Sequence, residues 1–259
     1  MRWTRPTTGP AARTAGPSSR NGRRRRSSAG SGATTPPTHT RRLPRPSEIR
    51  PPARRCAHYD GARREARMQV AVEGIVETLR GVPPARFQPG EVCARLRGLL
   101  LDPRTLQPYL HFAPRRYTRN LIYRDEIFEL IALCWEPHSQ SPIHNHSGQL
   151  CWLSIQRGAL RLENFKSLDG PGPGDGIRLV PNGGLTRATE GALDLQQGEN
   201  AIHRVSNPFD DRAVSLHVYS RPYDTCIAYD PPSQTARVMR LCYHSIGGKL
   251  VDGPPEQLQ

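Results

Sequence analysis

Apolar residues recur at helical spacing in the stretch that follows residue 68. Between positions 72 and 79 they are separated by three or four residues, which predicts a helix over 69–80. Proline is common at the first position of a helix, because its missing N–H would have no partner there. Pro89 and Pro103 therefore predict two further helices, and the whole stretch is expected to form a small helical cap.

After Pro114 the pattern changes to short runs of Ile, Leu, Val and aromatic residues separated by turn residues, which predicts β-strands. The predicted strands are 117–124, 127–136, 150–156, 159–165, 176–180, 193–197, 200–205, 213–219, 225–229 and 236–243. Arg157-Gly158 is expected to form a hairpin turn, and residues 169–176 a surface loop. Many short strands after a helical cap predict a mainly β fold, an antiparallel barrel or sandwich.

Charge is distributed very unevenly along the chain, which has 37 lysine and arginine residues against 23 aspartate and glutamate residues. Residues 1–67 hold 17 of the basic residues, all arginine, and 3 of the acidic ones, so the formal excess of +14 lies there. Residues 68–259 are balanced and offer no excess charge to a phosphate backbone. Nucleic acid is therefore not an expected partner of the folded part.

Residues 1–67 are rich in Arg, Pro, Ser, Thr and Gly and have no apolar periodicity, so they are predicted to be a disordered extension. Ordering the backbone costs about 1–2 kcal/mol per residue, which so few apolar side chains cannot offset. Three other interpretations stay open: an organelle transit peptide, a salt-sensitive nucleic-acid-binding arm, or a mis-assigned start with Met68 as the first residue. Residues 68–259 are predicted to form one domain.

The cysteines and the apolar runs indicate where in the cell the protein is expected. No stretch of about 18 consecutive apolar residues is present, so no membrane span is predicted. The six cysteines have no C-x-x-C spacing, and several lie in apolar, strand-like runs. This pattern favours buried free thiols over a disulfide framework, and the expected location is the cytoplasm.

Two histidines, His144 and His146, are one residue apart. Strand side chains alternate between faces, so residues spaced in this way project from the same side of a strand and can reach one metal ion. A third histidine, His203, occurs in a segment that ends at Asn207. The three histidines predict a metal centre. Their spacing alone does not decide between a zinc site with one open position and another divalent metal with several.

Several segments together resemble a known family. They are 117–120, 131–135, 144–151, 203–207 and 213–226. From about Met68 to about His244 the chain resembles cysteine dioxygenase, a thiol dioxygenase of the cupin superfamily. The resemblance implies a cupin antiparallel β-barrel or sandwich.

The resemblance also implies an Fe(2+) cofactor bound by His144, His146 and His203. Cupins usually add a glutamate ligand shortly after the His-x-His pair, and Cys151 stands there instead, so the implied centre is neutral. Such a centre is suited to a substrate that brings its own negative charge, since a coordinating thiol is deprotonated. The implied reaction is the oxidation of L-cysteine with O2 to cysteine sulfinic acid, a step of cysteine catabolism.

Arg119 and Tyr117 are implied to bind the substrate. A planar guanidinium matches a carboxylate in two parallel hydrogen bonds, each contact to a charged group being worth on the order of 1.5–3 kcal/mol. Relatives that act on 3-mercaptopropionate tend to have glutamine at this position, so Arg119 favours cysteine. Without the resemblance, Arg119 would be interpreted as a solvated strand residue.

Ser215, His217 and Tyr219 occupy alternate positions of one predicted strand and therefore face the same side. A relay through Ser215 and His217 is expected to orient the Tyr219 hydroxyl at the catalytic site. Satisfied polar residues of a barrel interior are the simpler interpretation of the pattern. Family members with a cysteine at the position of Cys151 join it to this tyrosine by a thioether bond, which implies that Cys151 belongs to the catalytic group.

The expected partners are the small molecules L-cysteine and O2, and the chain is expected to act as a monomer. Two alternatives remain. The chain could be a dioxygenase of another small thiol, such as 3-mercaptopropionate, or a non-catalytic metal-binding cupin that regulates a partner. Substrate competition tests the first alternative, and oxygen uptake that depends on cysteine and Fe(II) tests the second.

Overall fold

The computed structural model describes residues 69–198 and 201–252. The expectations for residues 1–67, the disordered extension and its alternatives, lie outside these residues. Within the described ranges, no helix is both long enough and apolar enough to cross a membrane.

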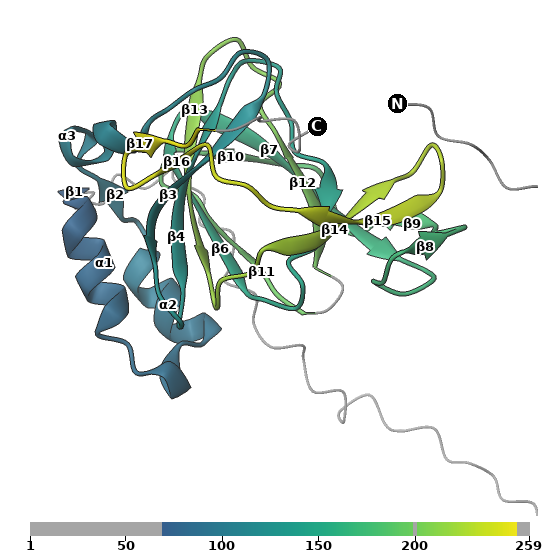
Figure 1. The fold of residues 1–259 in the computed structure, drawn as a ribbon, viewed down its shortest axis with the longest axis horizontal. Helices are drawn as coiled ribbons and strands as arrows, with labels where there is room; N and C mark the ends of the chain where they lie inside the picture. Colours follow the sequence, from purple (N-terminus) through teal and green to yellow (C-terminus); the bar gives the residue numbers. More distant parts are fainter. Residues whose placement is uncertain (1–68, 199–200, 253–259) are drawn as a thin grey trace, which may run out of the picture. The chain divides into compact units, whose positions relative to one another are not determined.

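Three short helices form a cap on one side of the strands (Figure 1). They are α1 (Val72–Arg80), α2 (Pro89–Leu96) and α3 (Pro103–Leu106), with the 3-10 turns η2 (Pro84–Arg86) and η3 (Gln107–Tyr109). The helix predicted over 69–80 begins only at Val72, because β1 (Gln69–Val70) pairs with β2 (Leu100–Leu101). Both prolines stand at the first helical position of their helices, as predicted.

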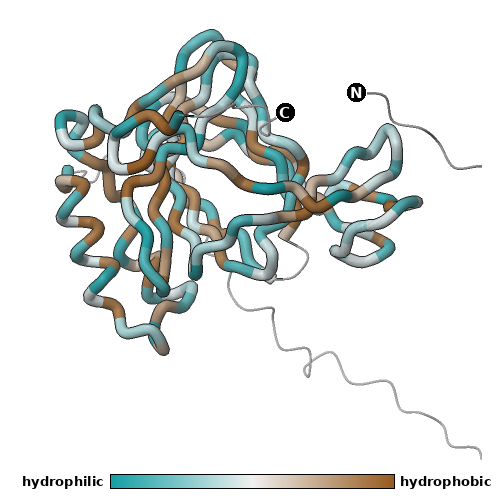
Figure 2. Tube along the Cα trace, in the orientation of Figure 1, coloured by the Kyte–Doolittle hydropathy of each residue, from teal (hydrophilic) through white to brown (hydrophobic). Residues whose placement is uncertain are grey.

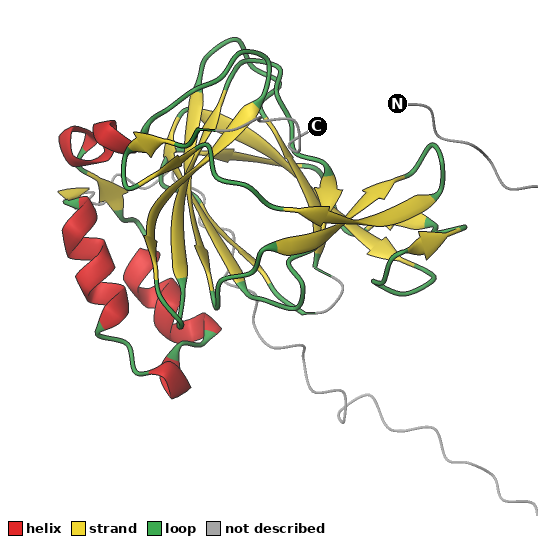
Figure 3. Cartoon of the chain, in the orientation of Figure 1, coloured by secondary structure: helices red, strands yellow, loops and turns green. Residues whose placement is uncertain are grey.

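Two curled sheets account for most of the remaining chain (Figure 3). The first has the order β10-β7-β12-β5-β14-β15-β8, with β9 beside β7. Its strands are β5 (Ile143–His144), β7 (Ala159–Ser167), β8 (Gly174–Asp175), β9 (Leu179–Pro181), β10 (Thr186–Thr189), β12 (Ile202–Ser206), β14 (Thr225–Asp230) and β15 (Thr235–Arg240).

The second sheet has the order β11-β6-β13-β4-β3-β16-β17. Its strands are β3 (Tyr117–Arg124), β4 (Glu129–Trp135), β6 (Cys151–Arg157), β11 (Leu193–Gln196), β13 (Ala213–Tyr219), β16 (Ser245–Ile246) and β17 (Lys249–Leu250). All its pairs are antiparallel except β3 with β16. The predicted mainly β fold of largely antiparallel strands with a helical cap is confirmed.

Short strands are where prediction and structure differ. Strands β5, β10, β16 and β17 were not predicted, because two to four residues are too few to display an alternating pattern. The strand predicted over 176–180 begins only at Leu179, and the end of the predicted loop forms β8.

The turn at Arg157-Gly158 is not a hairpin. Strands β6 and β7 on either side of it belong to different sheets, so the chain passes there from one sheet to the other. Gly158 has φ +77°, and a Cβ at this position would lie 3.0 Å from the carbonyl oxygen of Arg212. A glycine is required because the backbone conformation is left-handed and the neighbouring chain is close.

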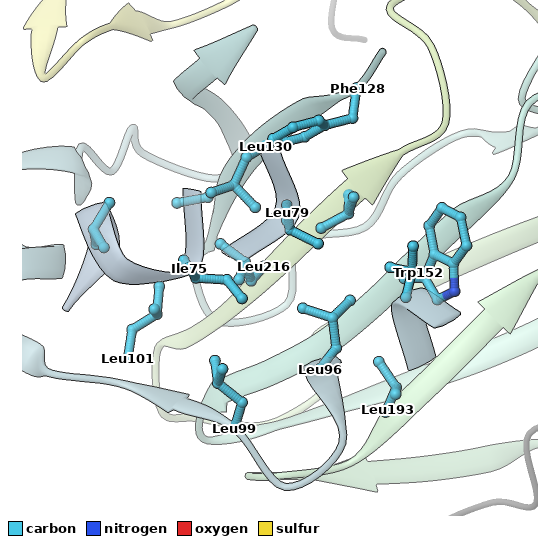
Figure 4. Close-up of a cluster of buried hydrophobic side chains, with 14 of the residues drawn as sticks. Ile75, Leu79, Leu96, Leu99, Leu101, Phe128, Leu130, Trp152, Leu193 and Leu216 are labelled. Atoms are coloured by element: carbon cyan, nitrogen blue, oxygen red, sulfur yellow. The ribbon is translucent and has the colours of Figure 1, made fainter. Parts of the chain in front are cut away.

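Strand β13 is buried on both faces, and each face packs against a different part of the fold. Val214, Leu216 and Val218 belong to an apolar cluster shared with the helices, in which Ile75 and Leu79 of α1 are fully buried (Figure 4). Burying one such side chain contributes roughly 1.5–3 kcal/mol. The helical cap therefore fixes the outer face of β13, and the alternate residues of the strand are directed into the barrel.

The interior of the barrel is a second cluster of buried side chains. Alternate residues of β4, Ile131, Leu133 and Trp135, belong to it, whereas Leu130 and Ala132 belong to the cluster under the helices. Figure 2 shows the resulting density of apolar positions along the strands beside the helices. Burial on both faces explains why β4 is a continuous apolar run apart from its first residue, Glu129.

The expected buried free thiols are confirmed at Cys134, Cys151 and Cys226. Cys93 of α2 is disulfide-bonded, so the expectation is wrong for that residue. Cysteine spacing alone could not reveal this bond, because connectivity is set by the tertiary structure.

Candidate metal centre and substrate cavity

The three predicted ligand histidines come together from two strands and a turn. His144 ends β5 and lies opposite His203 of β12 in the antiparallel register. His146 lies two residues past the end of β5, so the prediction that one strand carries both histidines is wrong in detail. Asn145 continues the pairing instead: its N–H donates to the carbonyl of Ile227, and its Oδ1 accepts the N–H of Ile227 at 2.9 Å. This contact brings the His146 ring within 5.3 Å of the His144 ring.

The geometry of the three imidazoles fits a shared metal ion. One nitrogen of each ring lies within 4.8 Å of the others, and the Nε2 atoms of His146 and His203 are 3.1 Å apart. Ligand nitrogens bind such metals at about 2.0–2.1 Å, so two of them on one ion are about 3 Å apart when they subtend a right angle. The Nδ1–H of His144 donates to the carbonyl of Pro142 at 2.9 Å, which leaves its Nε2 available as a ligand.

All three histidines are held in the neutral form that metal binding needs. Burial lowers the pKa of His144 to about 4, and it lowers the pKa of His146 and His203 well below the usual value. Among the described residues, the group able to hold an ion contains three imidazoles and no carboxylate. The centre is therefore uncharged before a metal or an anionic ligand enters.

A chain of hydrogen bonds runs through the side chains that β13 directs into the barrel. The indole N–H of Trp135 donates to Ser215 Oγ at 2.9 Å, and Ser215 Oγ lies 2.9 Å from Nε2 of His217. The serine hydrogen has no other acceptor in the described part of the chain, so it is donated to Nε2. His217 is neutral, since burial lowers its pKa to about 3. Its single proton is then on Nδ1, 3.3 Å from the Tyr219 hydroxyl oxygen.

This directionality begins at Trp135, because an indole N–H can only donate. With the serine hydrogen on Nε2, His217 Nδ1–H is a donor, and the Tyr219 oxygen at 3.3 Å and the Cys151 thiol at 3.7 Å both lie within its reach. The Tyr219 hydroxyl also forms side-chain hydrogen bonds with the Cys151 thiol and the Tyr223 hydroxyl. Burial raises the pKa of Tyr219 well above its usual value, so the hydroxyl keeps its hydrogen at neutral pH.

Cys151 lies directly opposite Tyr219, since the two residues are partners in the register of β6 and β13. The Cys151 thiol is 3.7 Å from Nδ1 of His217 and fully buried. Burial raises the pKa of Cys151, so the resting group is a thiol. The strand register, rather than any sequence proximity, brings this cysteine to the tyrosine.

Arg119 of β3 is buried beside the same group, with 3 % of its surface exposed. Its guanidinium lies 5.8 Å from the ring centres of both Tyr219 and Tyr243. Neither Nε nor Nη2 of Arg119 has a hydrogen-bond partner among the described residues. These two N–H groups form one edge of the guanidinium, the edge that binds a carboxylate in two parallel hydrogen bonds. Tyr117 stacks on Trp135, with ring centres 4.9 Å apart.

One small cavity joins the metal-binding and guanidinium groups. Its lining residues are Tyr117, Arg119, Leu133, Trp135, Ser141, His144, His203, Val205, His217 and Tyr219. The other predicted site residues, His146, Ser215 and Cys151, lie behind this lining and contact it through His203 and His217. The structure thus gathers every predicted site residue around one space.

Two buried residues near this space, Glu129 and Tyr223, and the partly buried Tyr243 were not predicted. Glu129 lies with Oε1 3.6 Å from Nη2 of Arg119, and Tyr243 donates its hydroxyl hydrogen to Glu129 Oε2 at 2.5 Å. Tyr223 packs edge-on against Tyr219 at 5.1 Å. Glu129 left a signal in the sequence, because an acidic residue opens an otherwise apolar strand. The two tyrosines left none, since tyrosines that pack against a barrel core are common.

Comparison with known proteins relates the chain to one enzyme family. A sequence model of the family described as "Cysteine dioxygenase type I" matches residues 89–232. The Homo sapiens protein named "Cysteine dioxygenase type 1" is 31% identical over 162 residues, which cover 60% of this chain and 76% of the human protein. The Rattus norvegicus protein of that name is 32% identical over 157 residues, with the same coverage. The Danio rerio protein is 30% identical and covers 57% of this chain and 73% of its own.

Proposed function

Because this chain belongs to the cysteine dioxygenase type I family and is therefore an oxygenase, we propose that it oxidises L-cysteine with O2 to cysteine sulfinic acid. The proposed metal is Fe(2+), held by His144, His146 and His203. The observation that supports this substrate most directly is the guanidinium edge of Arg119, which belongs to the same cavity as His144 and His203 and whose Nε and Nη2 have no hydrogen-bond partner among the described residues.

Each group of residues around the cavity has its own proposed role. Arg119 binds the substrate carboxylate through Nε and Nη2, and the stacked pair of Tyr117 and Trp135 forms the adjoining wall. Fe(2+) held in this neutral site would supply positive charge and open positions to a thiolate and to O2. The relay from Trp135 to His217 holds the Tyr219 oxygen, so that the tyrosine hydrogen is directed to the reacting sulfur or oxygen.

We also propose a thioether bond between Cys151 and Tyr219. The two residues are register partners, and both are fully buried. The bond replaces the thiol S–H and one ring C–H, so the protein loses two hydrogen atoms to an oxidant, here O2. Intact mass of the Cys151→Ser variant against the wild type, each measured before and after aerobic turnover, would detect the loss.

Three finer expectations complete the proposal. Residues 68–259 act as the catalytic domain, the enzyme acts as a monomer, and it works in the cytoplasm. Size-exclusion chromatography with light scattering tests the second expectation. A truncated protein that begins at Met68 and keeps its cysteine-dependent oxygen uptake supports the first.

Anaerobic loading of the protein with Fe(2+), followed by oxygen uptake with added thiols, tests the main proposal. We expect uptake with L-cysteine, weak uptake with 3-mercaptopropionate, and cysteine sulfinic acid as the product by mass spectrometry. The His203→Ala variant is the control, because it removes one proposed ligand. Oxygen uptake that does not depend on cysteine, or a preference for 3-mercaptopropionate, would contradict the proposal.

A further inference from the structure

A buried carboxylate lies next to the arginine that is proposed to bind the substrate. Glu129 is fully buried, and its Oε1 is 3.6 Å from Nη2 of Arg119. This distance is too long for a hydrogen bond, and neither Oε1 nor Nη2 has a hydrogen-bond partner among the described residues. The carboxylate therefore acts on the guanidinium through its charge, and no described residue forms a hydrogen bond to Nε or Nη2 of Arg119.

The opposite oxygen of Glu129 is held from the surface side. Tyr243 donates its hydroxyl hydrogen to Oε2 at 2.5 Å, and the same hydroxyl accepts a hydrogen bond from Arg124 Nη1 at 2.8 Å. Arg124 also donates to Asp224, which is exposed, at 2.9 Å. Burial raises the pKa of Glu129, while the charge of Arg119 and the hydrogen bond from Tyr243 oppose that rise. These contacts keep Glu129 fixed beside Arg119.

A buried arginine needs an anion nearby, because an unpaired charge in a barrel interior is strongly unfavourable. In the protein without substrate, Glu129 is that anion. A substrate carboxylate on Arg119 is a second anion on the same cation, so it meets partial repulsion from Glu129.

We infer that Glu129 is the internal counter-ion of Arg119 and a specificity-determining residue that weakens the binding of carboxylate-bearing thiols. The inference rests on the proposed role of Arg119. In this arrangement the carboxylate stabilises the empty site at the expense of affinity. It thereby sets how strongly the enzyme distinguishes cysteine from cysteamine, the thiol that lacks a carboxylate.

Glu129→Gln removes the charge and keeps the shape of the side chain. We expect the KM for L-cysteine to fall by roughly 30- to 100-fold, the effect of one charge about 6–8 Å away at an effective dielectric constant near 20. The KM for cysteamine is expected to stay within about twofold, because cysteamine has no carboxylate that the charge of Glu129 could repel. The melting temperature of the substrate-free variant should fall, and anaerobic L-cysteine should raise it by more than it raises that of the wild type.

Two further variants control this comparison. Tyr243→Phe keeps the ring beside Arg119 but removes the hydroxyl. We expect it to change the KM for L-cysteine and the melting temperature in the same directions as Glu129→Gln, by smaller amounts. Glu91→Gln makes the same substitution in α2, in a carboxylate paired with Arg86 at 2.8 Å and outside the cavity. It should leave the ratio of the two KM values unchanged.

The outcomes separate this inference from the proposed function. A KM for L-cysteine that rises in Glu129→Gln, or that changes equally for cysteamine, would overturn the counter-ion role while the wild-type activity stands. Wild-type protein that oxidises no cysteine, or that tolerates Arg119→Gln, would overturn the proposed function itself. If Glu129→Gln does not fold, Tyr243→Phe tests the counter-ion role instead, through the ratio of the KM for L-cysteine to the KM for cysteamine.

Discussion

Ser215→Ala tests the relay that runs from Trp135 to Tyr219. The serine hydroxyl is the acceptor of the Trp135 indole N–H and the donor to His217 Nε2, each at 2.9 Å, and all three residues are buried. The substitution removes one oxygen and leaves both neighbours in place. It therefore creates a buried donor and a buried acceptor without partners.

The expected loss of stability follows from these two orphaned groups. Each unsatisfied buried group costs about 1–3 kcal/mol. Because the freed space is small and the neighbours relax in part, we expect a total of about 2–4 kcal/mol in the free energy of unfolding. Urea unfolding followed by circular dichroism measures this value, and the slope of the transition should stay unchanged.

A double-mutant cycle separates the hydrogen bond from other effects of the substitution. Trp135→Phe removes the donor, so Ser215→Ala should cost less in that background, with a coupling energy of about 1–2 kcal/mol for residues in direct contact. Nitrogen-15 NMR of the histidines supplies a second reading. The wild type should have His217 protonated at Nδ1, and Ser215→Ala should show a mixture of both tautomers. Additive costs in the cycle, or an Nε2-protonated His217 in the wild type, would refute the reasoning.

Three further predictions concern the substrate, the metal and the core. Arg119→Gln should raise the KM for L-cysteine by roughly 10- to 100-fold, the loss of about 1.5–3 kcal/mol, while steady-state kinetics with cysteamine stay nearly unchanged. Fe(2+) at 100 times its dissociation constant should stabilise the protein by about 2.7 kcal/mol, and a chelator or His203→Ala should remove this gain in thermal unfolding. Leu79→Ala, at a fully buried position under the helical cap, should cost about 2–5 kcal/mol in urea unfolding. Val238→Ala, at a position 61% exposed, is its control and should stay within about 0.5 kcal/mol of the wild type.

Patterns with a fixed period predicted much of the fold. Strands β3 and β13 have the predicted bounds, and α2 begins at the predicted proline. These elements are long or carry a clear marker. The two-residue strand β5 could not be predicted, and it is the one that delivers His144 to the metal centre.

The residues of the candidate site also divide into those that local patterns predicted and those that they could not. Residue types and spacing identified His144, His146 and His203 as a ligand group, and the alternation of β13 placed Ser215, His217 and Tyr219 on one face. The pairing of Cys151 with Tyr219 and of Glu129 with Arg119 depends on strand register and on the folding of separate strands around one cavity.

The sequence by itself determined the element types, the helical cap and the kind of chemistry, because these depend on local period and side-chain type. Only the tertiary structure decided that Arg119 is buried, that Glu129 is its neighbour, and that the Trp135 indole donates a hydrogen bond to Ser215. Burial and charge pairing are properties of contacts between distant segments. No local pattern records them, since the same residue can be solvated or buried according to what packs against it.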